Sequence, residues 1–215
     1  MKAILVNYDY EPTWLKEYPD LDVTLYDRSD DGVERDLIQY GKVIKTENKG
    51  NVDYDKLGYL IENYYDLPEV FLWGKSNLFK YITKEEYDKV KDNKDYTPLL
   101  TRNHLIYTDN SIPGGNIVNA YDGDGMYYER FGIVNTLHQT MQWKYFKLWE
   151  DWCGYFNLPL TQMIPFPPGG NFLLTRERVQ RYGVDYYKEM QSTLDHAQIP
   201  VEAYFCERSY HLMWK

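Results

Sequence analysis

Short apolar runs alternate with an amphipathic segment along the first 80 residues. Residues 3–6, 23–26 and 70–73 are apolar runs rich in β-formers, and each is followed by polar residues. Between the second and third runs, apolar positions recur at helical spacing over residues 54–64, until Leu67-Pro68 ends the pattern. We therefore predict an α/β fold with one mixed, mostly parallel central sheet flanked by helices.

The middle of the chain predicts two helices separated by a long loop. Residues 83–96 are charged, and Thr83 and Glu86 have capping-box spacing, so we expect a helix that faces solvent. Residues 101–132 lack a clear period, and long loops inside compact domains are usually functional. Aromatic and apolar positions over residues 135–156 predict a long amphipathic helix whose stripe faces the core.

The last third combines a flexible turn with a charged return. The pair Gly169-Gly170 precedes Asn171, and glycine lets a backbone approach a ligand closely because it has no Cβ. Residues 172–174 predict a buried strand, and Thr175 predicts the N-cap of a helix over residues 176–194 with a break near Gly183. A turn of this kind followed by a charged segment is typical of an enzyme pocket.

Length indicates one generous domain. The 215 residues, 43% of them hydrophobic, are enough to fill one core. We divide the domain into a nucleotide-binding half, residues 1–80, and an acceptor and catalytic half, residues 81–215. The alternative that the chain is one domain of a larger protein stays open.

Charge and composition narrow the partners. A net charge of −9 argues against nucleic acid, because neutralising phosphates along a backbone requires a basic face. The 23 tyrosines suit a pocket that meets sugars, bases or peptides, although an AT-rich gene would enrich tyrosine as well. A small anionic ligand then needs a local basic cluster.

The cellular compartment is predicted from the cysteines and from the length of the apolar segments. Cys153 and Cys206 fit no metal or redox spacing, so we expect two buried, reduced thiols. The first apolar stretch is too short for a signal peptide, and no segment approaches the roughly 18 apolar residues of a transmembrane helix. We expect a cytoplasmic protein without a transmembrane segment.

Polar residues follow each of the predicted strands. Because ligands of doubly wound sheets bind outside the carboxyl ends of the strands, these residues mark the expected crevice. The row consists of Asn7, Tyr8, Asp27, Arg28, Gly74, Lys75 and Asn77.

Several blocks resemble a known family. Asn48-Lys-Gly-Asn51, then Gly58 to Gly74 with its Tyr-x-x-Leu-Pro and Phe-Leu-x-Gly elements, resembles the central block of an uncharacterised glycosyltransferase-like family. The blocks at residues 169–178 and 207–214 resemble its C-terminal part, so the likeness covers most of the chain outside residues 85–160. The resemblance implies a glycosyltransferase A-type fold with a nucleotide-sugar in the crevice.

The resemblance and the strand ends together give a set of binding residues. The first strand end suits the base, the loop at residues 48–51 suits the ribose and phosphates, and Lys75 or Arg208 suits the charge of the diphosphate. An ordinary turn is the competing interpretation of residues 48–51. The residues expected to bind the nucleotide-sugar are Asn7, Tyr8, Asp27, Asn48, Gly50, Asn51, Trp73, Gly74, Lys75, Gly169, Gly170, Asn171 and Arg208.

A metal ion is implied, but the sequence departs from the family pattern. Transferases that share this fold resemble one another in an Asp-x-Asp pair that holds Mn²⁺ or Mg²⁺ against the diphosphate. The expected strand end instead carries residues 74–77, Gly-Lys-Ser-Asn. Asp122, Asp124 and His211 are the candidate ligands that remain, against the alternatives of a solvated turn and a packed histidine.

An inverting transfer needs a general base within hydrogen-bond reach of the acceptor hydroxyl. Glu207 is the first candidate, Glu202 the second and Asp124 the third. A structural ion pair between Glu207 and Arg208 is the alternative for the first. The sequence thus predicts a glycosyltransferase that moves a sugar from a nucleotide-sugar, such as a UDP-sugar, to a glycan or glycoprotein acceptor. The alternative is an inactive carbohydrate- or nucleotide-binding module with the same fold.

Overall fold

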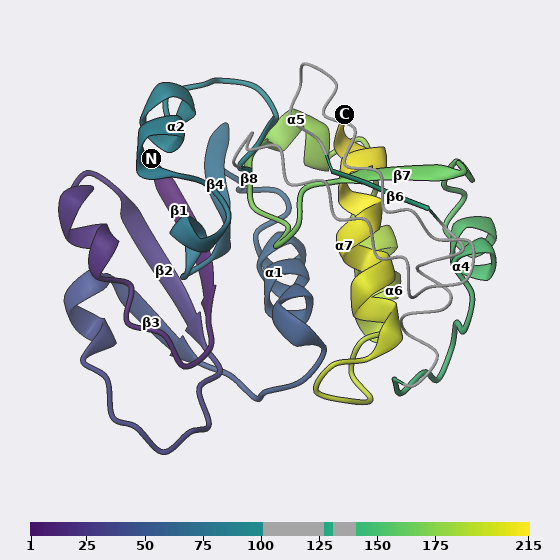
Figure 1. Cartoon of the computed structure of the whole chain (residues 1–215), viewed down its shortest axis with the longest axis horizontal. Helices are drawn as coiled ribbons and strands as arrows, with labels where there is room; N and C mark the ends of the chain where they lie inside the picture. Colours follow the sequence, from purple (N-terminus) through teal and green to yellow (C-terminus); the bar gives the residue numbers. More distant parts are fainter. Residues whose placement is uncertain (101–126, 131–140) are drawn as a thin grey trace, which may run out of the picture.

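A six-stranded sheet organises the protein (Figure 1). The computed structural model describes residues 1–100, 127–130 and 141–215. The sheet order is β3-β2-β1-β4-β8-β5; β1 to β4 are parallel, β8 is antiparallel to β4, and β5 is antiparallel to β8. The predicted mostly parallel mixed sheet is confirmed. Its strands are β1 (Lys2–Asn7), β2 (Asp22–Asp27), β3 (Lys42–Lys45), β4 (Val70–Lys75), β5 (Thr97–Pro98) and β8 (Phe172–Thr175).

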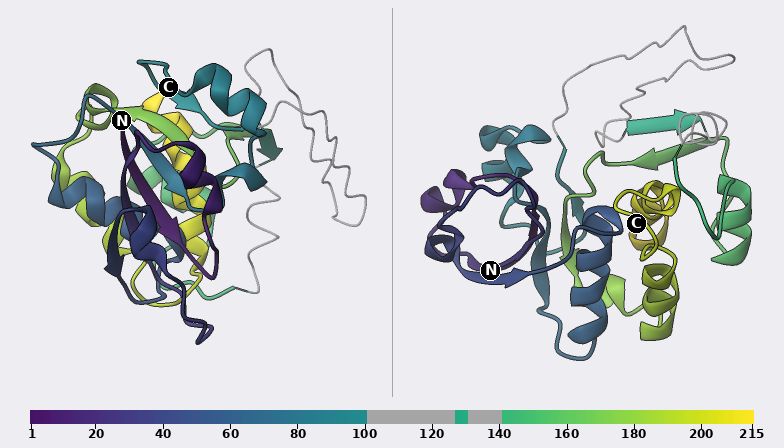
Figure 2. Two further views of the ribbon diagram at one scale, coloured as in Figure 1. Left: turned by 90° about the vertical axis from the view of Figure 1, so that its left-hand side faces the viewer. Right: turned by 90° about the horizontal axis from the view of Figure 1, so that it is seen from below.

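Helices cover both faces of this sheet (Figures 1 and 2). On one face lie α1 (Asn51–Glu62), α6 (Val184–Ser192) and α7 (Val201–Trp214). The other face carries α2 (Lys84–Val90) and three 3₁₀ helices, Thr13–Glu17, Leu37–Tyr40 and Leu78–Lys80. Within the described part of the chain, no helix is long and apolar enough to cross a membrane.

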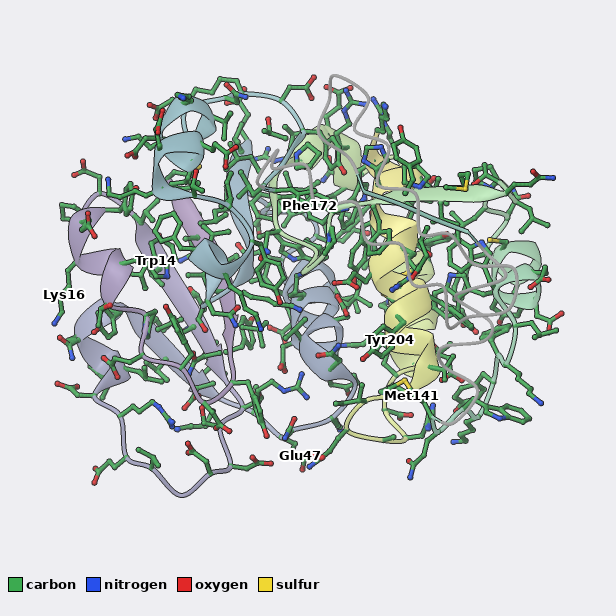
Figure 3. The ribbon with its side chains drawn as sticks, viewed as in Figure 1. Trp14, Lys16, Glu47, Met141, Phe172 and Tyr204 are labelled. Carbon is green, nitrogen blue, oxygen red and sulfur yellow. The ribbon has the colours of Figure 1, made fainter. Side chains whose placement is uncertain are left out.

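The alternation of side chains along β1 explains its continuous apolar run. Ile4 and Val6 pack into the core beneath α1 and α7, whereas Ala3 and Leu5 pack into the second core beneath α2. A parallel strand that is buried on both faces has no solvent side, so the sequence shows no alternation of apolar and polar positions. Phe172 of β8, labelled in Figure 3, packs into the same core as Ile4 and Val6.

A second, two-stranded antiparallel ribbon packs beside α7. It is formed by β6 (Tyr127–Arg130) and β7 (Met163–Phe166), and α4 (Trp149–Tyr155) lies at its far end (Figure 1). Buried Trp149 and Trp152 join α4 to the same core as α7. The ribbon was not predicted, because four-residue strands interrupted by Pro165 give little sequence signal.

The two N-cap residues predicted from the sequence are confirmed. The Thr83 side chain accepts a hydrogen bond from Glu86 N, and the Glu86 carboxylate accepts one from Thr83 N, so the capping box is confirmed. Thr175 caps α5 (Arg176–Val179), with Arg178 N donating to its hydroxyl. The helix predicted over residues 83–96 ends earlier, at Val90, and its Tyr87 is buried rather than facing solvent.

The long helix predicted over residues 135–156 is wrong in its described part. Residues 141–148 are not helical, and only α4 forms; residues 135–140 lie outside the described residues. The backbone N–H groups of Lys144, Tyr145 and Phe146 all donate to the Glu202 carboxylate, at 3.0, 2.8 and 3.2 Å. Because these three N–H groups donate to one buried side chain, they do not form the backbone hydrogen bonds of an α-helix.

Candidate functional site

A cavity opens at the carboxyl ends of β1 and β4. The chain leaves β1 toward β2 on one side, and β4 lies on its other side, so this is the switch point where open α/β sheets bind ligands. The cavity has a volume of about 220 Å³. Its described lining consists of Val6, Tyr8, Arg28, Asn48, Asn51, Val52, Lys75, Ser76, Asn77, Tyr81, Gln198 and Ile199.

The start of α1 is fixed against the loop that precedes α7, and both form the cavity wall. Gly50 adopts φ +65°, and a Cβ there would lie 2.6 Å from Tyr54 Cβ and 2.9 Å from Leu194 O. This close approach lets Gly50 N donate to Ala197 O and Asn51 N donate to Gln198 O, each at 2.7 Å. The sequence element at residues 48–51 is thus a tight helix entry that borders the cavity.

Arg28 follows β2 and reaches the cavity from beneath. Its side chain is 2% exposed, and Nη2 donates to Lys49 O. Nη1 lies 3.7 Å from Asp55 Oδ2, while neither Nε nor Nη1 has a hydrogen-bond acceptor in the described structure. Burial lowers the pKa of Arg28, and it raises the pKa of Asp55 to about 6. The site therefore holds a buried cation with unmatched donors.

Tyr8 and Asn48 form the exposed rim. Tyr8 is 49% exposed, and its hydroxyl donates to Asp30 Oδ1 at 3.2 Å. Asn48 Nδ2 donates to the other oxygen of that carboxylate at 2.7 Å. The rim thus presents an aromatic face held in place by a carboxylate that does not itself line the cavity.

Asn7 and Asp27 lie behind the cavity rather than on its wall. Asn7 Nδ2 donates to Asp27 Oδ1 at 3.0 Å, and Ser76 Oγ donates to Asn7 Oδ1 at 2.5 Å. Burial alone would raise the pKa of Asp27, but hydrogen bonds from Lys45, Ser29 and Asn7 outweigh it and lower the pKa. These two predicted ligands instead tie together the ends of β1, β2 and β4.

Gly74 and Asn171 join the cavity to the glycine turn. A Cβ on Gly74 would lie 2.6 Å from Asn171 Oδ1, which accepts a hydrogen bond from Lys75 N at 2.8 Å. The Asn171 side chain is buried, and its Nδ2 has no partner in the described structure. Gly74 is therefore needed so that Asn171 can fix the backbone of Lys75.

The Gly169-Gly170 turn is held by two charged side chains. Lys56 Nζ donates to Gly170 O at 2.6 Å, and Glu207 Oε1 accepts from Gly169 N at 2.7 Å. Burial lowers the pKa of Lys56 to about 8. Burial would also lower the pKa of Lys75, but Glu207, Tyr81 and Asp53 together outweigh burial and raise the pKa. Glu207 thus lies beside both the turn and the cavity lysine.

Beneath the turn, polar groups of α1 and α7 meet in the core. Tyr210 donates to Asp53 Oδ1 at 2.9 Å, and Cys206 Sγ donates to Tyr210 at 2.9 Å. Burial raises the pKa of both Asp53 and the Cys206 thiol. Cys153 is buried and unbridged like Cys206, which confirms the expected pair of buried, reduced thiols.

The second candidate base is a structural clamp. Glu202 is fully buried; Oε1 accepts the three backbone N–H groups of residues 144–146, and Oε2 lies 3.1 Å from His196 Nε2. A carboxylate with four such partners is committed to holding the segment before α4. Its place at the start of α7 is also favourable for negative charge.

Arg208 and His211 also contact internal partners. Arg208 Nε donates to buried Glu129 Oε2 at 2.6 Å, and its guanidinium lies 4.3 Å from the centre of the Phe166 ring. His211 Nδ1 lies 2.8 Å from the Tyr96 hydroxyl in a buried setting. The predicted diphosphate ligand therefore ties α7 to the β6–β7 ribbon.

Trp73 belongs to the core. Its side chain is fully buried, with Lys56 Nζ 4.0 Å from the centre of its ring and Tyr210 and Trp214 packed edge-on against it. It has no face to offer a sugar, so its predicted contact with the nucleotide-sugar is wrong. A tryptophan at the end of a strand can either pack into the core or stack on a sugar, and the sequence alone does not distinguish the two.

The donor set does not fit a divalent cation. Mn²⁺ and Mg²⁺ favour oxygen ligands, above all carboxylates, whereas the β4 end places the Lys75 ammonium in the cavity and no Asp or Glu belongs to the described lining. Among the described residues, no group of three His, Cys, Asp or Glu side chains is placed to hold a metal ion. Asp122 and Asp124 lie outside the described residues.

The sequence indicated part of the cavity lining. Tyr8, Asn48, Asn51 and Lys75 line it as expected, and Gly50, Gly74 and Asn171 shape its walls. It did not single out Gln198 and Ile199, which come from the loop before α7 and carry no motif. Arg28 stood in the row of strand-end residues, but only its missing hydrogen-bond acceptors distinguish it from an ordinary ion pair.

In comparisons of the chain with protein-family models, with curated proteins and with solved structures, no match was found.

Proposed function

We propose that the protein is a glycosyltransferase that binds a nucleotide-sugar, such as a UDP-sugar, in the switch-point cavity. One observation carries the proposal: the cavity combines an exposed tyrosine rim with two cations, Arg28 and Lys75, and no carboxylate among its described lining residues. An aromatic face suits a nucleobase, and paired cations suit a diphosphate, whose charge increases as it leaves.

We assign each part of the proposed donor to a part of the cavity. The base stacks on Tyr8 at the rim, the diphosphate lies between Arg28 and Lys75, and the sugar points toward the Gly169–Asn171 turn. The mixed sheet, with antiparallel β8 next to parallel β4, is compatible with a glycosyltransferase A-type fold. Glu207, next to that turn and to Lys75, is the candidate base for a glycan or glycoprotein hydroxyl.

Titration with UDP, GDP and CMP tests the proposal, with and without Mn²⁺, while the melting temperature is followed. A ligand that binds only the folded state at 100 times its Kd adds about 2.7 kcal/mol of stability, which a melting curve detects. We expect one nucleotide to raise the melting temperature more than the others. If none of the three does so, the enzyme proposal fails.

A second candidate is a binding module that recognises the nucleotide or a carbohydrate without transferring it. It is favoured by the partners of the candidate bases: Glu202 is fully hydrogen-bonded, and Glu207 already accepts from Gly169 N. Hydrolysis of UDP-sugars separates the two candidates. Turnover that is lost in Glu207→Gln, with UDP binding retained, supports the enzyme; UDP binding without any turnover supports the module.

A further inference from the structure

The charge of the cavity is opposite to that of the protein. The chain carries a net charge of −9, yet the cavity is lined by one arginine and one lysine and by no Asp or Glu among its described residues. The charged side chains on the cavity wall are thus both cations, while the carboxylates that face them, Asp55 and Glu207, lie behind the wall. This difference between the charge of the lining and that of the whole chain favours a negatively charged ligand, but it does not show which side chain binds it.

Counting hydrogen bonds singles out Arg28. A guanidinium has five N–H groups and cannot lose its charge, so each buried N–H needs an acceptor. Nη2 donates to Lys49 O, but Nε and Nη1 have no acceptor in the described structure, although the side chain is 2% exposed. Asp55 Oδ2 lies 3.7 Å from Nη1, beyond hydrogen-bond distance, and is itself without a hydrogen-bond partner. The guanidinium is thus balanced in charge but not in hydrogen bonds.

The start of α1 adds a positive field but few donors. This 12-residue helix begins at the cavity, where its dipole places about half a positive charge. However, Gly50 N and Asn51 N donate to carbonyls of the loop before α7, and Val52 N donates to Asn51 Oδ1. The helix therefore favours an anion electrostatically, while hydrogen bonds to the anion must come from side chains.

Nε and Nη1 of Arg28 carry three N–H groups without an acceptor, one on Nε and two on Nη1, and the oxygens of a tetrahedral anion are acceptors for such groups. Guanidinium groups bind phosphates through charge-assisted hydrogen bonds, and Lys75 adds a second positive charge from the β4 end. A divalent ion has no carboxylate in the described lining to hold it in the same place.

We infer that the cavity is a phosphate-binding site that works without a metal ion, with Arg28 as the principal hydrogen-bond donor to the phosphate and Lys75 as the second cation. This inference rests on the same cavity as the proposed function and names the group that binds the charged part of its ligand. It does not require sugar transfer, so inorganic pyrophosphate is a sufficient probe.

Calorimetric titration of the full chain with pyrophosphate tests the inference. The wild type should bind pyrophosphate in EDTA at least as tightly as in Mn²⁺, because Mn²⁺ itself complexes pyrophosphate. Arg28→Met should weaken binding by about 10- to 100-fold, the range for losing hydrogen bonds to a charged group. Arg28→Lys, which keeps the charge but not the planar guanidinium with its five N–H donors, should bind with an affinity between those of the wild type and Arg28→Met. Arg181→Met, which removes an exposed arginine that does not line the cavity, should bind as the wild type.

The outcomes separate the inference from the proposed function. Wild-type affinity in Arg28→Met, or binding that requires Mn²⁺, overturns the inference. If circular dichroism shows that Arg28→Met does not fold, Lys75→Met and the EDTA comparison decide in the same way. Pyrophosphate binding that depends on Arg28, without preference for any nucleotide, supports the inference and counts against a nucleotide-sugar donor. UDP binding that is unchanged in Arg28→Met supports a nucleotide-sugar donor and counts against Arg28 as the phosphate ligand.

Discussion

Two charged regions of this protein look equally reactive in sequence and differ in how their groups are partnered. In the α7 region, Glu202 has four hydrogen-bond partners and Arg208 pairs with Glu129 at 2.6 Å. In the cavity, two nitrogen atoms of Arg28, Nε and Nη1, have no acceptor in the described structure. Since buried polar groups in proteins are nearly always satisfied, the first pattern indicates structure and the second indicates a ligand.

Breaking the pair of Arg208 with Glu129 should have the largest effect on stability. Arg208→Met leaves Glu129 buried without its partner, which costs about 3–5 kcal/mol of unfolding free energy in urea. The double variant Arg208→Met with Glu129→Met should recover most of the loss, and Arg181→Met should change little. A loss in Arg208→Met no greater than in Arg181→Met would show that Arg208 is not structural.

The Glu202 clamp should rank second. Glu202→Gln keeps one acceptor oxygen but loses the charge that receives three backbone N–H groups, so we expect a loss of about 1.5–3 kcal/mol in the same assay. Glu177→Gln, on an exposed carboxylate, is the matched control. If Glu202→Gln is as stable as the wild type but abolishes turnover, Glu202 is a base and the comparison is wrong.

The pair of Arg28 with Asp55 should give a pH dependence of the opposite sign to that of an ordinary salt bridge. The folded pKa of Asp55 is about 6, above its ordinary value, so the folded state binds more protons than the unfolded state between about pH 4 and 6. Stability should therefore fall as pH rises through this window, by on the order of 2 kcal/mol.

Urea unfolding between pH 4 and 7 measures this effect. Asp55→Asn should flatten the slope, whereas Asp66→Asn, at an exposed position, should leave it unchanged. A slope of equal size in Asp55→Asn would show that other groups are responsible and that Asp55 is not held against a poorly bonded guanidinium.

The smallest expected effects on stability come from two glycine substitutions, which distinguish backbone strain from a steric clash at the cavity wall. Gly32 and Gly50 both adopt positive φ, but a Cβ on Gly32 meets nothing within 4 Å, whereas one on Gly50 meets Leu194 O at 2.9 Å. Gly32→Ala should cost about 1 kcal/mol from φ alone, and Gly50→Ala about 1 kcal/mol more. Only Gly50→Ala should also weaken pyrophosphate binding; equal losses in both assays would contradict a wall fixed at Gly50.

Local signals in the sequence explain what was predicted well. The buried strands β1, β2 and β4 appear as apolar runs because a strand covered on both faces must be apolar throughout. The capping box of Thr83 and Glu86 was recognisable because all its atoms belong to four consecutive residues. The polar ends of β1 and β4 marked the cavity because parallel strands finish at one edge of the sheet.

The sequence by itself thus determined the α/β class, the buried strands β1, β2 and β4, and the edge of the sheet at which the cavity opens. The tertiary structure decided which charged groups have internal partners and which lack them. Glu202 meets residues 144–146, and Arg208 meets Glu129, across 56 or more residues of chain, and no local pattern encodes such pairs. The missing acceptors of Arg28 are likewise a property of its surroundings, because a hydrogen bond depends on which distant groups the fold brings within 3.5 Å.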